Sequence, residues 1–346
     1  CPPSLSLARA PSAAAAAPAR RPPGARASAG VALDPPSLAT MRVLWAHAYS
    51  MNSMCTAADG RLVTSGSDGR VRVWSRGGGV VEAELAHDAH TAYAMCALTD
   101  GSNRVVTGGY DRVARLYDLS AARGGAQLAP IREYRGHTSS VVSMAAMSGG
   151  RLATGSMDDT VRVWDVESGA CLATLHAGVE CTVSAMVVMD EDTLVCNGPG
   201  RTIGVWDTRS YTRIATIKVP SYPRGLLRLA DGTLASGHPY GVVRLWDVRR
   251  LQCVGELRGP TGWVCNLAQL GDGRLIGVAR DQTAALWDVA ARTCVGVLRA
   301  RNNLERCCAT SDGGVAVGCN GGSVTLLGIV WARRGMAVAA WAGVWS

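Results

Sequence analysis

Short apolar runs alternate with polar residues along most of the chain, and glycine-containing turns interrupt them at a nearly fixed interval. In residues 161–164 (Val-Arg-Val-Trp) apolar and polar side chains alternate, the pattern of a half-buried β-strand. The turns begin at Asp59, Asp100, Gly149, Asp190, Asp231, Asp272 and Asp312, which are 41, 49, 41, 41, 41 and 40 positions apart. Their Asp-Gly and Gly-Gly pairs predict two-residue hairpins, in which residues take positive φ.

A second marker keeps the same interval. In six copies an aromatic residue, usually a Trp followed by Asp, ends an apolar run: Trp74, Tyr117, Trp164, Trp206, Trp246 and Trp287. In the last copy Leu327 takes this place. Two markers with one period indicate seven copies of one supersecondary unit, each too small to bury its own apolar face. We therefore predict an all-β fold, a seven-bladed β-propeller of four-stranded antiparallel blades.

Three parts are expected along the chain. Residues 1–40 form a Pro-, Ala- and Arg-rich tail that we expect to be disordered. Residues 41–330 hold the propeller, and residues 331–346 form a C-terminal tail that does not continue the repeat. Residues 42–45 are predicted to supply the outer strand of the last blade, which would fasten the ring and remove an exposed edge. Residues 119–130 contain an insertion, predicted to be a surface loop on blade 2.

Composition and net charge limit the classes of function that we expect for this chain. A hydrophobic fraction of 48% in 346 residues suffices for a large core, and the net charge of +8 is partly in the N-terminal tail. The remaining charge is spread, so we do not expect sequence-specific nucleic-acid contacts. An RNA- or ribosome-associated propeller is the alternative, and it predicts binding that weakens steeply with salt.

The 12 cysteines show no CxxC pair and no zinc spacing. Many of them occupy apolar positions of the repeat, and we interpret these as small buried hydrophobes in a reducing compartment, with the adjacent Cys307 and Cys308 facing opposite sides of a strand. We expect an intracellular protein, cytoplasmic or nuclear, although residues 1–40 also resemble an organelle transit peptide. The apolar run after Arg334 has 12 residues, too few for a membrane span. A monomeric propeller within a larger complex is expected.

The third unit resembles a complete WD repeat. It has Arg-Gly-His at 135–137, Thr-Gly-Ser at 154–156, and Val-Arg-Val-Trp-Asp at 161–165, and the resemblance extends over residues 42–327. It implies a hydrogen-bond chain, here called the brace, from His through Ser or Thr to Trp, with Asp orienting the His. By resemblance its members are His137, Ser156, Asp158 and Trp164.

The other units depart from this pattern. Gly66 stands where the first unit should have its Ser, and the remaining units lack at least one member. The resemblance therefore implies one complete brace, in blade 3, with a structural role.

No motif in the chain indicates an enzyme. P-loop, HExxH, GxSxG and EF-hand patterns are absent from the sequence, and the six histidines are scattered through the units. Asp190 and Asp192 form a carboxylate pair, but they belong to a hairpin turn. We predict no catalysis, no cofactor and no metal.

The predicted binding surface lies at the mouth of the central channel. Aligning the units places seven residues just before the inner strands: Ser50, Tyr93, Ser140, Thr182, Tyr222, Trp263 and Asn303. Aromatic side chains close to Arg224 and Arg306 are typical of binding hot spots, and packing between blades is the alternative. The predicted function is a non-catalytic protein-protein interaction scaffold that presents this rim to one or more partner proteins.

Arg209 and Arg249 suggest a second interpretation. Both close a WDxR sequence in consecutive units, at 206–209 and 246–249. The pair resembles the docking box of WD-repeat substrate receptors of cullin-RING ubiquitin ligases, in which the Arg contacts the adaptor. The alternative is an ordinary solvated turn.

Overall fold

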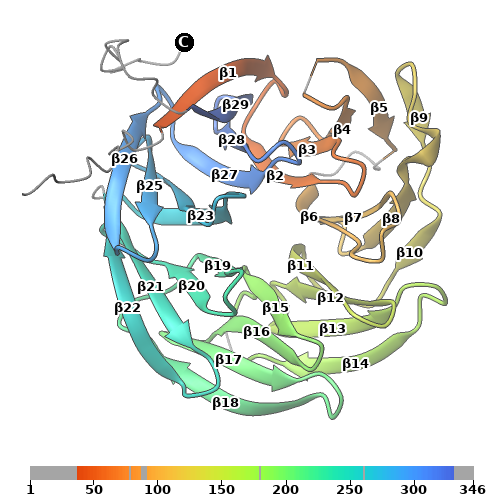
Figure 1. Cartoon of the computed structure of the whole chain (residues 1–346). Helices are drawn as coiled ribbons and strands as arrows, with labels where there is room; N and C mark the ends of the chain where they lie inside the picture. The colour runs from red at the N-terminus through yellow and green to blue at the C-terminus, as the bar shows by residue number, and fades with distance from the viewer. Residues whose placement is uncertain (1–36, 78, 87–91, 179–180, 260–261, 331–346) are drawn as a thin grey trace, which may run out of the picture. The chain divides into compact units, whose positions relative to one another are not determined.

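The predicted strands form and gather into seven sheets around a ring, each with four antiparallel strands (Figure 1). The structure is a computed structural model, and it describes residues 37–77, 79–86, 92–178, 181–259 and 262–330, all within one compact unit, residues 34–346. The tails predicted at 1–40 and 331–346 lie outside these residues, except for the strand residues 37–40.

The strands of the first four blades run in chain order from the inside of the ring outwards. Blade 1 has β2 (Met51–Thr56), β3 (Leu62–Gly66), β4 (Val71–Trp74) and β5 (Val81–Leu85). Blade 2 has β6 (Ala92–Ala97), β7 (Arg104–Gly109), β8 (Ala114–Asp118) and β10 (Arg132–Tyr134). Blade 3 has β11 (Val141–Met147), β12 (Arg151–Ser156), β13 (Thr160–Asp165) and β14 (Cys171–His176). Blade 4 has β15 (Met186–Asp190), β16 (Thr193–Gly198), β17 (Thr202–Asp207) and β18 (Thr212–Lys218).

The last three blades repeat the plan. Blade 5 has β19 (Gly225–Arg228), β20 (Leu234–Gly237), β21 (Val242–Asp247) and β22 (Gln252–Arg258). Blade 6 has β23 (Val264–Gln269), β24 (Leu275–Ala279), β25 (Thr283–Asp288) and β26 (Thr293–Arg299). Blade 7 has β27 (Leu304–Ala309), β28 (Val315–Cys319) and β29 (Ser323–Val330), and its outer strand is β1 (Ser37–Trp45).

The strand β1 closes the ring. It pairs antiparallel with β29, with Leu44 opposite Val324 and Trp45 opposite Ser323, so the predicted closure by residues 42–45 is confirmed. The pairing extends back to Ser37, four residues before the predicted start of the propeller. The first and last strands of the ring are therefore held in one sheet, and the outer edge of β29 is covered.

The core lies between the blades. One cluster joins Leu116 and Tyr134 of blade 2 to Leu152 and Trp164 of blade 3, and an equivalent cluster fills each of the other six interfaces. This follows from the alternating pattern, because a sheet with two apolar faces needs a neighbour on each side. In blade 7, Cys307 packs toward blade 6 and Cys308 toward blade 1, as their adjacency predicted.

The prediction of two-residue hairpins is wrong for the Asp-Gly turns. In blade 1 the N–H of Ala57 donates to the carbonyl of Arg61, and the N–H of Gly60 donates back to Ala57, which leaves three residues in the loop. Only Gly60 has a positive φ, +87°. Asp59 instead accepts a hydrogen bond from the N–H of Arg61, 3.1 Å away. A three-residue loop with one left-handed glycine therefore replaces the tighter turn.

The insertion between the third and fourth strands of blade 2 is more ordered than a surface loop. A 3-10 helix, η1 (Leu119–Ala121), follows β8, and β9 (Ala126–Leu128) then pairs in parallel with β5. Blade 1 thereby gains a fifth strand, which the prediction missed because residues 126–128 are too short for a period to be visible.

Candidate functional site

The brace of blade 3 forms, but with a different hydroxyl from the one predicted. Nδ1 of His137 lies 2.8 Å from Oδ2 of Asp158, and Nε2 lies 2.8 Å from Oγ1 of Thr154. Nε1–H of Trp164 donates to the same Thr154 hydroxyl at 2.8 Å. Ser156 is outside the chain of bonds, because its hydroxyl donates to the carbonyl of Ser139.

Strand register explains this correction. Trp164 lies opposite Leu152, so Thr154 is one pleat away on the same face and Ser156 is two. The indole N–H reaches the nearer hydroxyl. The hydroxyls of Thr154 and Ser156 lie on the same face of the strand, so residue spacing alone could not decide which of them accepts the bond from Trp164.

The charges in this brace are fixed by burial and hydrogen bonding. Burial lowers the pKa of His137 by more than Asp158 raises it. Burial raises the pKa of Asp158, but hydrogen bonds from Thr160, the N–H of Thr138 and His137 outweigh it and bring the pKa to about 2. A neutral imidazole therefore donates from Nδ1 to an ionised carboxylate and accepts from Thr154 at Nε2. Every polar atom in the chain is satisfied, which is a structural arrangement.

Blade 1 has a complete brace as well, so the implied single brace is wrong. His47 contacts Oδ1 of Asp68 at 2.8 Å and Oγ1 of Thr64 at 3.0 Å, and Trp74 donates to Thr64 at 2.8 Å. Gly66 is no defect, because the hydroxyl comes from Thr64. The sequence carried this signal, a Thr ten residues before the Trp in both blades.

Blade 5 contains a variant that the sequence analysis missed. Trp246 donates from Nε1 to Oγ of Ser236 at 2.7 Å, and Ser236 lies 2.8 Å from Nε2 of His238. The imidazole here comes from the residue after the second strand instead of from the loop before the first. Its Nδ1 contacts Ser221, and burial followed by the charge of Arg244 lowers the pKa of His238 to about 4. A Ser-x-His sequence at the end of a strand is the signal that could have revealed it.

Six of the seven predicted rim positions are equivalent. The carbonyls of Ser50, Ser140, Trp263 and Asn303 each accept a hydrogen bond from the first N–H after the second strand of their own blade. Strand pairing places Thr182 and Tyr222 at the corresponding points of blades 4 and 5.

Tyr93 is misplaced in the predicted set. It lies inside β6, next to Ala92, at the point where the pairing of β6 with β7 shifts register. In β2 the residue at this point is Asn52. The reason is a hairpin two residues longer in blade 2, where Ala92 pairs with Gly109, whereas in blade 3 Val141 pairs with Ser156.

Tyr222 and Thr182 are joined across two blades. The Nδ2 of Asn197 donates to the Tyr222 hydroxyl at 2.7 Å, and that hydroxyl lies 3.3 Å from the Thr182 carbonyl. Tyr222 therefore fastens blade 5 to blade 4, which agrees with the packing alternative for this residue.

Arg224 and Trp263 form a stacked pair at the rim. The guanidinium carbon of Arg224 lies 4.8 Å from the ring centroid of Trp263, and both side chains are partly exposed. In the next blade Arg306 donates from Nε to the carbonyl of Asn52 at 2.5 Å, and burial lowers the pKa of its guanidinium. Two cations and an indole from blades 5, 6 and 7 thus lie at the inner strands, where a carboxylate or an apolar side chain of a partner could bind.

Arg209 and Arg249 lie at the other end of the strands. Each follows a third strand, which runs parallel to the inner strand of its blade and so ends at the edge opposite the rim. Their side chains are 75% and 91% exposed, and both face the turn of blade 4. Arg209 pairs with Asp192 at 2.6 Å, and Arg249 lies 3.9 Å from Asp190.

Neither a metal site nor a membrane span is found in the described part of the chain. No group of three His, Cys, Asp or Glu side chains there could hold a metal ion. The described residues contain no helix with the length and hydrophobicity needed to cross a bilayer.

Comparisons with known proteins agree with this geometry. The model of the WD domain, G-beta repeat, matches residues 39–75, 128–165 and 251–288. Mitochondrial division protein 1 from Kluyveromyces lactis is 29% identical over 58% of this chain and 27% of its own length, and the Pyricularia oryzae protein of that name is 28% identical over 66% and 37%. The DENN domain and WD repeat-containing protein SCD1 of Arabidopsis thaliana is 29% identical over 38% of this chain and 11% of its own.

The chain thus spans about a third or less of these relatives. Among solved structures, the WD40 β-propeller domain of Doa1 matches 84% of this chain and 97% of its own, with a TM-score of 0.73 and 20% identity, which concerns the fold alone. Repeats, braces and ring closure agree: the chain contains WD40 repeats and folds as a seven-bladed WD40 β-propeller.

Proposed function

We propose that this chain is a non-catalytic scaffold that binds partner proteins at the rim cluster, defined as Arg224, Trp263 and Arg306. The observation that carries the proposal is the Arg224–Trp263 stack at 4.8 Å. Arg and Trp are the residue types enriched at interface hot spots, and here a rigid sheet holds both in place. Among the described residues, His47, His137 and His238 each contact a hydroxyl within a blade.

The test is affinity purification of the full chain, with mass spectrometry of the bound proteins. Trp263→Ala and Arg224→Glu should each lose partners that the unchanged chain retains, with the same melting temperature. Ile131→Ala is the matched control, because Ile131 is a large hydrophobic residue, 54% exposed, that lies away from the rim at β10. Equal recovery of partners by all four proteins would reject the rim as the binding site.

A second function, substrate receptor of a cullin-RING ubiquitin ligase, is favoured by Arg209 and Arg249. Their exposure and their common approach to the Asp190–Asp192 turn make them one surface feature. Because exposed ion pairs contribute about 0–1 kcal/mol, changing both to Ala should leave folding intact. The double variant should lose co-purification with a cullin adaptor, whereas the rim variants should keep it. Retained co-purification would remove this function.

A further inference from the structure

Blade 7 lacks every side chain of the brace. Val315 lies opposite Leu327 as Leu152 lies opposite Trp164, so Leu327 replaces the Trp and Val317 replaces the Thr. By the same register Gly321 stands at the place of the Asp. Asn303 is the equivalent of Ser50 and Ser140, so Ala300 stands at the place of His47 and His137, and Arg301 is the next residue.

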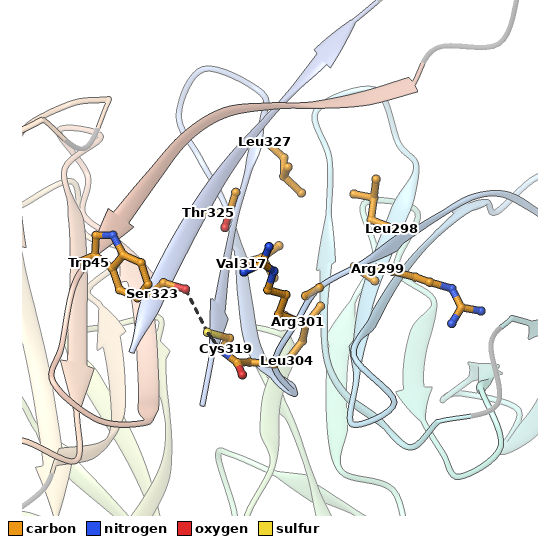
Figure 2. A pocket seen from close by; sticks show the side chains of 13 residues that line it. Trp45, Leu298, Arg299, Arg301, Leu304, Val317, Cys319, Ser323, Thr325 and Leu327 are labelled. Atoms are coloured by element: carbon orange, nitrogen blue, oxygen red, sulfur yellow. Dashed lines mark hydrogen bonds between the residues drawn. The ribbon is translucent and has the colours of Figure 1, made fainter. Parts of the chain in front are cut away.

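These replacements leave a pocket between blades 6 and 7. It has a volume of about 250 Å³, and its lining includes Val317, Leu327 and Arg301 together with Leu298 of blade 6. Figure 2 shows Leu327 and Leu298 on opposite sides of this space, with Trp45 at another side. In blades 1 and 3 the Trp indole packs in the corresponding interface. The pocket is smaller than the 300–1,000 Å³ typical of drug-sized sites, and it suits one aromatic side chain.

The pocket also lacks an acid. In the braces of blades 1 and 3 a carboxylate contacts the imidazole, but in blade 7 Gly321 has no side chain and the amide of Asn302 lies beside it. Arg301 is exposed and forms no ion pair among the described residues, and Figure 2 draws its guanidinium among the lining side chains. The guanidinium of the neighbouring Arg299 points away from the pocket in the same view. An apolar cavity beside an uncompensated cation is complementary to an aromatic group that carries a carboxylate close by.

We propose that this pocket binds an acidic aromatic peptide segment of a partner protein, whose aromatic side chain takes the place of the absent Trp and whose carboxylate pairs with Arg301. The exposed indole of Trp45, 73% accessible, adds an aromatic wall for the residues that flank the anchor. The site is separate from the rim cluster, so it does not depend on the function proposed above.

The test uses the full chain and fluorescein-labelled peptides in fluorescence anisotropy. Gly-Ser-Asp-Trp-Glu-Gly-Ser should bind at least tenfold more tightly than the same peptide with Lys in place of both acids, or with Ala in place of Trp. Leu327→Trp should fill the pocket, reduce binding at least tenfold and raise the melting temperature. Arg301→Glu should also reduce binding at least tenfold.

Arg299→Glu is the matched control, since it makes the same charge change two residues away with a guanidinium that points away from the pocket (Figure 2), and it should alter binding less than threefold. Arg301 is exposed, so Arg301→Glu should fold even if Leu327→Trp does not. Three results would overturn the proposal: no preference for the acidic Trp peptide, unchanged binding by Leu327→Trp with a normal melting curve, or equal losses from the two arginine variants. Loss of partners by Trp263→Ala with normal peptide binding would show that the two surfaces are independent.

Discussion

Trp164 and Thr154 are joined by a hydrogen bond of 2.8 Å from the indole N–H to the hydroxyl, and Trp74 and Thr64 repeat it at the same length. Each hydroxyl also contacts a histidine in the loop that leads from the preceding blade into this one. A single Thr side chain therefore connects the third strand of its blade to that loop. The brace is therefore an interblade connection, and its energetics should depend on the threonine.

Thr154→Val should destabilise the protein by about 1–3 kcal/mol, because it preserves shape while it leaves the indole N–H and Nε2 of His137 without a buried partner. Urea unfolding measures the loss. Ser156→Ala is the comparison: it should leave the Trp164 indole N–H protected from hydrogen exchange, whereas Thr154→Val should expose it. The opposite order of protection would restore Ser156 to the brace.

Gly66→Ala should destabilise the protein by about 1–3 kcal/mol, although a residue larger than Gly occupies this position in a complete WD repeat. A Cβ at Gly66 would lie 2.4 Å from the ring of His47, which Thr64 and Asp68 hold in place. Thermal unfolding measures this change in stability. Combining the substitution with His47→Ala should cost less than the sum of the two, and strict additivity would show that the ring is not the obstacle.

His238 should make stability depend on pH. Its folded pKa of about 4 lies below the unfolded value of about 6.5, so the neutral imidazole stabilises the fold fully above pH 6.5. That contribution, at most about 3 kcal/mol, should be lost progressively as the pH falls from 6.5 toward 4, because the unfolded chain binds the proton more readily.

Urea unfolding at several pH values tests this, with His238→Gln expected to flatten the slope in that window. His176 is exposed, so His176→Asn serves as the control and should leave the slope unchanged. A slope that persists in His238→Gln would assign the titration to another group.

Removal of β1 should open the ring. A chain that begins at residue 46 loses the buried side chain of Leu44 and the ladder with β29, which together should cost at least about 3 kcal/mol. A chain that begins at residue 37 should unfold as the full chain does. The exposed edge of β29 should also promote association, visible by size-exclusion chromatography. Equal stability of the two truncated chains would show that closure contributes little.

The sequence by itself determined the number of blades, the four strands of each and the closure of the ring. A 41-residue period, carried by Asp-Gly turns and Trp residues, leaves few folds open, because each unit must bury both faces against a neighbour. Backbone preference and the alternation of apolar and polar residues are local properties, so both can be read directly from the order of residues along the chain.

Only the tertiary structure decided which side chains meet. Thr154 displaces Ser156 in the brace because of cross-strand register, and Tyr93 leaves the rim because one hairpin is two residues longer. His238 enters a network from the position after the second strand of its blade, and the pocket at Leu327 exists because several small replacements coincide in space. Such contacts join residues that are distant in sequence, so a shift of one or two positions, which hardly alters a repeat pattern, changes the partner of every side chain.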